Sequence, residues 1–209
     1  MSAMELWYST TSPFARKVRV AAEELGLSSR IRLHETNPWR DDGGLRAVNP
    51  LCKVPTLVAD DGVDDRLVLY ESGVICDYLD ALGSERRLFP ESGHARWRAL
   101  VLQGLCDGAL TAAGRLFAEE QKRNEERSVA MIARFTAAID AALDDLETRD
   151  LAFAEPTIGD ICVAVFCGYL DFRWPQRDWR TRRPRLAGWF EVYDMGVSMQ
   201  KTRHRPMRG

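Results

Sequence analysis

The pattern of hydrophobic and polar positions changes near residue 82. Before that point, short apolar runs alternate with segments of helical periodicity. Met4 to Tyr8 is a brief apolar and aromatic run, which is typical of a buried strand. Ser12 and Pro13 then favour a helix start, because serine is a strong N-cap and proline is preferred at the first helical position. Apolar positions at helical spacing follow until Gly26, which is expected to end the helix.

The next elements are two strand signals, a hairpin and a helix. Residues 30–36 alternate between apolar and polar side chains and predict a second strand. Residues 55–59 and 66–70 flank Asp60-Asp61-Gly62 and predict a β-hairpin. Ser72 is expected to cap a further helix. The predicted order is βαβ, a loop, and then ββα.

After Pro90 the strand signals stop, helical patterns follow, and residues 171–209 form a basic tail that contains three tryptophans. Long apolar repeats at helical spacing run over residues 95–119 and 129–146. Thr157 with Asp160 three residues later indicates a capping box, with Asp in place of the usual Glu. The chain therefore predicts a small α/β domain followed by an all-helical one.

Length and charge narrow the classes of protein to which the chain can belong. Its 209 residues carry 29 Lys and Arg against 31 Asp and Glu, a net charge of −2. A nucleic-acid-binding protein is expected to show a clear positive excess, so that class is excluded. No apolar run approaches the roughly 18 residues that cross a bilayer, and Met1 to Tyr8 lacks the pattern of a signal peptide. We therefore expect a cytoplasmic protein without a membrane segment.

The cysteines and histidines predict neither a disulfide framework nor a metal centre. The five cysteines contain no CxxC pair. None of the three histidines has a second histidine at metal-ligand spacing. We expect reduced and mostly buried thiols, and no metal.

Four motifs occur along the chain in a fixed order. They are Ser12 to Arg19, Asn49 to Leu57, Leu69 to Ser72, and Thr157 to Asp160. In this order and spacing they resemble the glutathione-transferase family, closest to bacterial members with serine at the active position, such as the YibF-like group. The resemblance covers almost the whole chain, and four motifs on the expected elements are specific where one alone would be weak.

The resemblance implies a thioredoxin-like domain over residues 1–82, a linker over 83–90 and an all-helical domain over 91–209. It implies glutathione as co-substrate and gives Ser12 the catalytic role, in which the hydroxyl donates to the glutathione sulfur at a helix N-terminus. Lowering a thiol pKa by ~1.5 units needs roughly 2 kcal/mol, and one hydrogen bond to a charged group supplies ~1.5–3 kcal/mol. Taken alone, Ser12 is explained as a helix cap. Tyr8 is the second candidate, because some classes use a tyrosine at the end of the first strand.

Further positions match the family's glutathione-binding residues, namely Phe14, Lys53, Val54, Pro55, Glu71 and Ser72. The resemblance implies a cis Val54–Pro55 bond, with the Val54 backbone pairing with the cysteinyl backbone of glutathione. Glu71 would accept from the γ-glutamyl ammonium, and Ser72 with free helix amides would receive its carboxylate. Lys53 would attract the glycyl carboxylate. The ordinary explanations are a strand-initial proline, a helix cap with an acidic neighbour, and a solvated lysine.

Two residues decide what chemistry the resemblance implies. Cys52 stands where relatives commonly have glycine, and either a packed thiol or a mixed disulfide with glutathione fits that position. Position 12 is serine and not cysteine, which counts against thiol exchange. Ser9, Thr10 and Thr11 are other hydroxyls near the proposed site.

The leading hypothesis is a glutathione transferase that acts in detoxification on a small hydrophobic electrophile held by the helical domain. A non-catalytic binding module of the same fold is the alternative, because fold does not settle function. A glutathione-dependent thiol reductase acting through Cys52 is a weaker one. The family also implies a two-fold homodimer.

Overall fold

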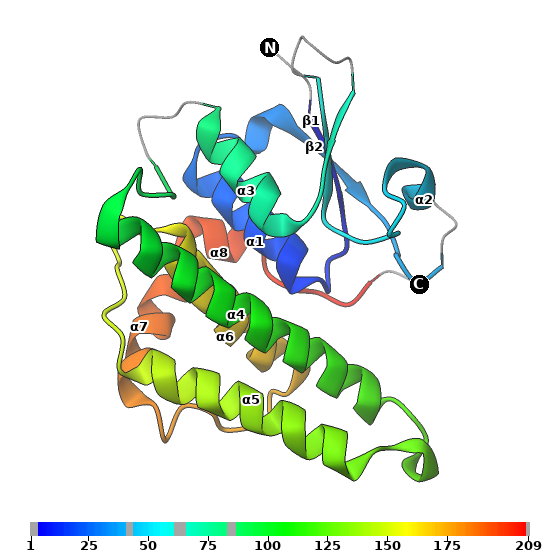
Figure 1. Ribbon diagram of the computed structural model, residues 1–209, viewed down its shortest axis with the longest axis vertical. Coiled ribbons are helices and arrows are strands. Elements are labelled where there is room, and N and C mark those ends of the chain that lie inside the picture. The colour runs from blue at the N-terminus through cyan, green and yellow to red at the C-terminus, as the bar shows by residue number, and fades with distance from the viewer. Residues whose placement is uncertain (1–3, 41–43, 61–65, 83–86, 208–209) are drawn as a thin grey trace. The chain divides into compact units, whose positions relative to one another are not determined.

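The computed structural model describes residues 4–40, 44–60, 66–82 and 87–207 (Figure 1). The chain divides into two compact units. The sheet unit contains Met1–Phe89 and Val197–Gly209, and the helical unit contains Pro90–Gly196. The resemblance assigned residues 91–209 to the helical domain, whereas residues 197–209 group with the sheet. The expected linker, 83–90, lies partly outside the described residues.

The sheet unit is built on four strands, which are β1 (Met4–Tyr8), β2 (Ile31–Glu35), β3 (Thr56–Ala59) and β4 (Leu67–Leu69). Their order is β2-β1-β3-β4, with β1 and β2 parallel and the other two pairs antiparallel. This mixed sheet is thioredoxin-like, as predicted. The predicted hairpin is confirmed by the antiparallel pairing of β3 with β4. Part of its predicted turn, at Asp61 and Gly62, lies outside the described residues.

Helices cover both faces of this sheet. The unit's helices are α1 (Pro13–Glu24), α2 (Leu45–Val48), α3 (Ser72–Ala81) and α8 (Val197–Lys201), with a 3-10 turn at Ser28–Arg30. Figure 1 shows α1 and α3 on one face and α2 on the other. On the α2 face, Leu45 and Cys52 pack with Trp7 of β1. Gly26 has a φ of 68°, which explains why glycine ends α1.

The start of α3 differs from the prediction by one residue. Ser72 was expected to be the N-cap, but it is the first helical residue, and Glu71 occupies the cap position without a side-chain capping bond. Serine is the better N-cap of the two residue types, so local pattern favoured a helix boundary one residue too late. Ser72 is 3% exposed, so its side chain faces inward rather than into solvent.

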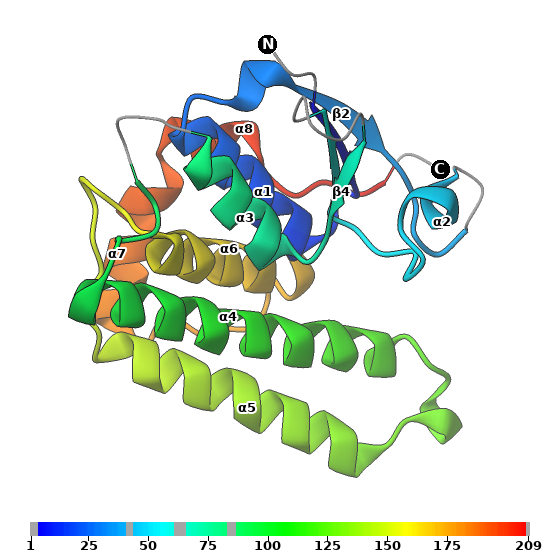
Figure 2. The same cartoon turned by 45° about the horizontal axis from the view of Figure 1, so that its top comes forward.

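The helical unit consists of α4 (Gly93–Glu120), α5 (Val129–Glu147), α6 (Ile158–Arg173) and α7 (Pro184–Asp194), with a 3-10 turn at Asn124–Glu126. Figure 2 shows α4 and α5 side by side and α6 against α4. Within α6, the predicted capping box is confirmed. A Cβ on Gly159 would lie 2.8 Å from the Ala99 carbonyl oxygen, so glycine is what allows α6 to approach α4.

Among the helices that the structure describes, none combines the length and the apolar composition needed to cross a bilayer.

Candidate functional site

The N-terminus of α1 is capped by a serine and carries no acidic side chain of its own. Ser12 lies in extended backbone, and its Oγ accepts a hydrogen bond of 3.2 Å from the Ala15 amide. Pro13 takes the first helical position, and none of residues 13–16 is acidic. A serine hydroxyl has one proton to donate and two lone pairs, so accepting from Ala15 leaves the proton for an anion. The cap and the thiolate donor are therefore compatible roles of one hydroxyl.

The Tyr8 hydroxyl already faces a carboxylate. It donates to Glu35 Oε2 over 3.4 Å, and Arg205 pairs with the same oxygen at 2.8 Å. Arg19 lies 4.9 Å from the Tyr8 ring centroid, and burial lowers the pKa of this guanidinium. Arginine nevertheless stays charged at neutral pH. Of the two candidate thiolate donors, Tyr8 therefore has its proton directed to Glu35.

The three hydroxyls between Tyr8 and Ser12 belong to the turn that leads into α1. Ser9 Oγ and Thr11 Oγ1 lie 3.0 Å apart, and the Thr11 amide also donates to Ser9 Oγ, over 3.3 Å. Ser9 and Thr10 are buried. Ser9 and Thr11 thus have partners within the turn itself.

A buried asparagine organises the loop between α2 and β3. Asn49 is 0% exposed. Its Nδ2 donates to the Lys53 carbonyl over 3.2 Å and to Thr56 Oγ1 over 2.9 Å. Its Oδ1 accepts from the Leu51 amide at 2.9 Å. In the sequence, Asn49 is recognisable only as part of a motif, because no local pattern shows that its side-chain amide joins both ends of the loop.

Val54 and Pro55 lie at the end of this loop, directly before β3. The peptide bond between them is cis, as the resemblance implies. Val54 is half-buried against the Trp7 cluster, and Pro55 is buried. Because β3 begins at Thr56, the Val54 backbone lies just beyond the strand ladder, where an extended ligand could pair with it.

Two opposite charges face each other beside this loop. Lys53 Nζ lies 3.9 Å from Glu71 Oε1, and both side chains are 67% exposed. Ser72 follows Glu71 at the start of α3, where the first helix amides have no partner within the helix. The structure therefore brings Lys53, Glu71 and Ser72 together, with a cation, an anion and helix amides in one place.

Phe14 is the second residue of α1 and is half-buried. The ammonium of Lys17, one turn further on, lies 5.9 Å from its ring centroid. Lys17 itself is 0% exposed. Contact between Phe14 and glutathione stays a prediction.

Cys52 is a packed thiol in a left-handed turn. Its φ of 50° lies in the region that favours glycine, which explains why glycine suits this position. The side chain is 7% exposed and packs with Trp7 and Leu45, while Sγ lies 3.8 Å from the Pro38 carbonyl oxygen. All five cysteines lie within the described residues, are buried and form no disulfide. Burial raises the pKa of the Cys167 thiol, which therefore stays protonated.

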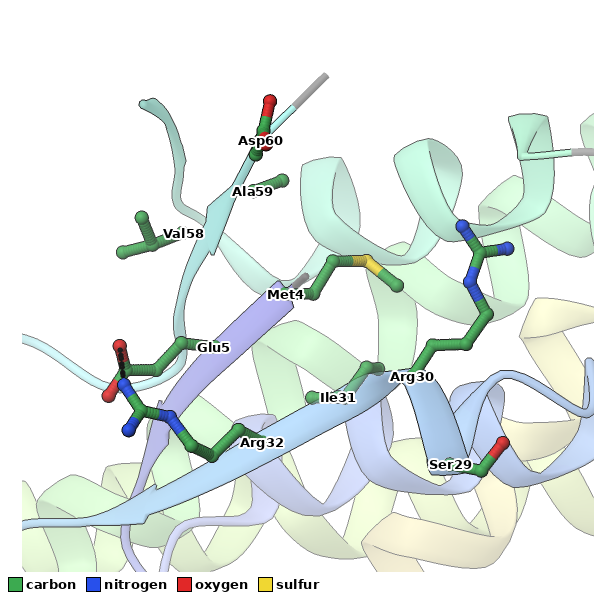
Figure 3. A pocket seen from close by; sticks show the side chains of 9 residues that line it. All are labelled: Met4, Glu5, Ser29, Arg30, Ile31, Arg32, Val58, Ala59 and Asp60. Atoms are coloured by element: carbon green, nitrogen blue, oxygen red, sulfur yellow. Dashed lines mark hydrogen bonds and ion pairs between the residues drawn. The ribbon is translucent and has the colours of Figure 1, made fainter. Parts of the chain in front are cut away.

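A hollow of about 440 Å³ lies at the opposite end of β1 from Ser12 (Figure 3). Met4 and Ile31, the first residues of two parallel strands, form part of its wall. At its edge Arg32 pairs with Glu5 at 2.9 Å. Because β1 separates this hollow from Ser12, it is not part of the candidate site.

Within the ranges that the structure describes, no three His, Cys, Asp or Glu side chains gather closely enough to hold a metal ion.

Two family models match the chain. Residues 11–82 match "Glutathione S-transferase, N-terminal domain", and residues 130–191 match "Glutathione S-transferase, C-terminal domain". The first match contains Ser12, the Val54–Pro55 loop and the Glu71–Ser72 pair. The second contains the α6 capping box.

Individual relatives match over most of the chain. An uncharacterized GST-like protein, YibF of Escherichia coli K12, is 29% identical over 88% of this chain and 90% of its own length. Glutathione S-transferase GstB of the same organism is 31% identical over 89% of this chain and 90% of its own length. A glutathione transferase family member from Pseudomonas fluorescens Pf-5, solved with bound glutathione, is 34% identical over 98% of this chain and 100% of its own, with a TM-score of 0.88. The same protein was also solved with S-(propanoic acid)-glutathione.

Proposed function

The chain belongs to the glutathione S-transferase family, and we propose that it is a glutathione transferase in which Ser12 stabilises the glutathione thiolate. The observation that carries the proposal is the Ser12 hydroxyl, which caps α1 and still has a proton to donate. The thiolate would attack an electrophilic carbon of an acceptor held by the helical unit, forming a C–S bond. In a substitution the leaving group departs with its electron pair; in an addition the displaced π electrons take up a proton.

The charged residues beside the loop support a site for the γ-glutamyl end. We assign Glu71 to its ammonium, and Ser72 with the first α3 amides to its carboxylate. The resemblance gave Lys53 to the glycyl carboxylate, but its position 3.9 Å from Glu71 favours the γ-glutamyl carboxylate instead. An α-amino acid presents both charges on one carbon, which matches a Lys and Glu side by side.

The ligands of the Pseudomonas relative support a thioether product. That protein holds glutathione in one structure and S-(propanoic acid)-glutathione in another. By analogy, this chain would conjugate glutathione to an acceptor that becomes the sulfur substituent. We propose this as a detoxification reaction of the cytoplasm.

The reductase alternative has little support from Cys52. Its side chain packs against Trp7 and Leu45 and is 7% exposed, and the position at the start of α1 is serine. A thiol-exchange enzyme needs an accessible thiolate. The non-catalytic module remains the competing class, and turnover separates it from an enzyme.

The test combines glutathione binding by calorimetry with turnover of a chloronitroaromatic acceptor. We expect saturable binding and chloride release that depends on glutathione. Binding without turnover of any acceptor would assign the chain to the non-catalytic class. Absence of binding would overturn the proposal.

The assignment of Glu71 to the γ-glutamyl ammonium has its own test. Glu71→Gln should raise the glutathione Kd roughly fivefold, about 1 kcal/mol, because the pair is largely exposed and its gain is modest. Asp77→Asn removes another exposed acid of the same helix and should leave Kd unchanged. An unchanged Kd for the Glu71 variant would remove Glu71 from the site.

We also propose a homodimer. Trp97 and Val101 lie one turn apart on α4 and are 64% and 54% exposed, which supports an apolar contact surface on that helix. The chain mass is 23.7 kDa. Sedimentation at micromolar concentration should show twice that mass, and a monomer would exclude the dimer.

A further inference from the structure

The chain segment after α8 crosses the turn that leads into α1. Residues 203–207, here called the C-terminal strap, belong to the same compact unit as the sheet. Figure 1 draws this segment in red, running from α8 past the start of α1. His204 Nδ1 and the Arg205 amide both donate to the Thr10 carbonyl oxygen, over 3.2 Å and 3.4 Å. The strap is therefore bonded to the main chain two residues before Ser12.

These contacts hold both ends of one peptide group. A carbonyl oxygen only accepts hydrogen bonds, so Nδ1 is the protonated ring nitrogen of His204. At the other end of the same peptide group, the Thr11 amide donates to Ser9 Oγ over 3.3 Å. Ser9 Oγ in turn lies 3.3 Å from Sδ of Met207 in the strap. Because a peptide group is planar, these contacts fix the orientation of the peptide between Thr10 and Thr11.

The side chain of Arg205 connects the strap to the sheet. Its guanidinium pairs with Glu35 Oε2 at 2.8 Å, and Glu35 is the last residue of β2. The same carboxylate oxygen accepts from the hydroxyl of Tyr8, the last residue of β1. Arg205 thus contacts the backbone of the turn through its amide and the ends of two parallel strands through its side chain.

Ser12 is joined to this turn by its own backbone. Its amide donates to the Ser9 carbonyl over 3.1 Å, and its hydroxyl accepts from the Ala15 amide. Since φ and ψ are the only soft dihedrals between Thr10 and Ser12, a rotation of the peptide after Thr10 displaces the Ser12 hydroxyl. A displacement of about 1 Å is enough to weaken a catalytic contact strongly.

We propose that the C-terminal strap positions Ser12, with His204 and Arg205 as positioning residues for the glutathione thiolate. This inference rests on the proposed function and adds to its site a segment from the opposite end of the chain. A purely structural explanation is that the contacts only secure a chain terminus. The two explanations differ in what they predict for the bound thiol, because securing a terminus does not alter the pKa of that thiol.

The test measures thiolate absorbance against pH for glutathione bound to the full chain. His204→Phe keeps an aromatic ring and removes the Nδ1 donor. It should raise the pKa of the bound thiol by roughly half a unit to one unit, less than the loss of the Ser12 hydroxyl itself. His204→Asn places an amide N–H close to the position of Nδ1 and should restore the wild-type pKa.

Arg205→Met tests the second positioning residue. It removes the ion pair with Glu35 and should raise the thiol pKa by less than His204→Phe does, because this arginine side chain is 47% exposed. Lys201→Met is the matched control. Lys201 pairs with Glu23 at 2.9 Å and is 58% exposed, but Glu23 lies near the C-terminal end of α1. Its loss should leave the thiol pKa unchanged.

Combined variants test whether the strap acts through Ser12. Added to Ser12→Ala, His204→Phe should cause no further rise in the thiol pKa, because two changes that act through one hydroxyl are not additive. Amide hydrogen exchange on the unliganded chain gives a second measurement. Exchange at the Thr11 and Ser12 amides should become faster in His204→Phe, while the amides of the helical unit keep their rates.

An unchanged thiol pKa in folded His204→Phe, alongside a raised pKa in Ser12→Ala, would overturn the inference and leave the proposed function standing. A rise of equal size with and without the Ser12 hydroxyl would also overturn it, since the strap would then act by another route. If His204→Phe does not fold, Arg205→Met decides in the same way. If the wild type does not bind glutathione at all, the proposed function fails and takes this inference with it.

Discussion

The helices α1 and α6 both begin after a hydroxyl residue, but their N-termini differ in the charge that faces them. At α6, the Asp160 carboxylate accepts from the Thr157 amide at 2.8 Å, from the Thr157 hydroxyl at 2.7 Å and from the Ala152 amide at 2.9 Å. At α1, Ser12 accepts from Ala15, and no acidic residue follows in the first turn. The first turn of α6 carries a carboxylate of its own, and the first turn of α1 does not.

The difference separates a structural cap from a ligand site. A helix N-terminus carries the equivalent of about half a positive charge, which an anion stabilises. At α6 the protein supplies that anion, so the position serves the fold. At α1 the hydroxyl cap leaves room for an external thiolate. A hydroxyl before a helix is therefore ambiguous in sequence, and the acid three residues later is what distinguishes the two cases.

The largest expected effect is at α6. Asp160→Asn should lower the free energy of unfolding by about 3 kcal/mol, because three hydrogen bonds lose a charged acceptor at a site that is 4% exposed. The glutathione Kd of the folded variant should stay unchanged. Urea unfolding and calorimetry measure the two quantities. Asp150→Asn, at an exposed acid, is the control and should change neither.

The elements that local pattern predicted are those whose contacts are local. The Ser12 cap and the Thr157 capping box each join residues three positions apart, and both are confirmed. The strand at Met4–Tyr8 is confirmed because its apolar run is short and bounded.

Features that depend on distant partners were not predictable in the same way. Residues 197–209 group with the sheet unit because Ser198 donates to Glu24 at 2.6 Å and Arg16 donates to the Met199 carbonyl at 3.2 Å. These pairs lie more than a hundred residues apart in sequence, and no local pattern encodes them.

The next largest effect is expected at the N-terminus of α1, which Ser12 caps. Ser12→Ala should raise the pKa of enzyme-bound glutathione by roughly one to two units, the loss of one charge-assisted hydrogen bond of ~1.5–3 kcal/mol. Because the pKa rises, the thiolate fraction falls at neutral pH, and the rate should partly recover as pH increases. Thiolate absorbance against pH measures this directly. Affinity for glutathione should change much less.

Loss of the cap is the confounding effect, and a second cap controls for it. Ser12→Ala should also cost about 1 kcal/mol of stability. Ser128 caps α5 by accepting from the Met131 amide at 3.3 Å, so Ser128→Ala should cost a similar amount with no change in the thiol. If the bound thiol titrates identically in wild type and Ser12→Ala, Ser12 is a cap alone, and Tyr8→Phe becomes the next variant.

A smaller effect is expected from the loop beside the open helix start. Asn49→Ala removes two donated bonds and one accepted bond inside a buried site, which should cost about 2 kcal/mol of stability. Unlike Asp160→Asn, it should also weaken glutathione binding, by several-fold, because the Val54 backbone is no longer fixed. Thr56→Ser keeps the hydroxyl that Asn49 contacts and is the matched control. A glutathione Kd that is unchanged in folded Asn49→Ala would show that the loop is positioned without it.

The smallest expected effect is at the start of α3. It tests whether this helix N-terminus, like that of α1, can bind an anion of glutathione because its first turn has no acidic side chain. Val74 is the third residue of α3 and is 51% exposed, so a charged side chain fits there without being buried. Val74→Glu would give α3 an acid of its own in the first turn, as Asp160 does for α6. That charge should compete with the γ-glutamyl carboxylate and raise the glutathione Kd by roughly two- to fivefold, or ~0.3–1 kcal/mol, with less effect at high salt.

Charge and size are separated by two further substitutions at the same position. Val74→Gln has a similar shape without the charge and should leave Kd close to that of the wild type, while Val74→Lys should lower it. The helix itself should tolerate the glutamate, because an acid in the first turn is favourable to the dipole. A glutamate variant that loses stability but keeps its Kd would place the carboxylate of glutathione elsewhere than α3. An increase in Kd that is equal in the glutamate and glutamine variants would point to shape rather than to the helix dipole. If the start of α3 binds the carboxylate of glutathione, the glutathione Kd should rise in Val74→Glu and fall in Val74→Lys. Both changes should become smaller at high salt.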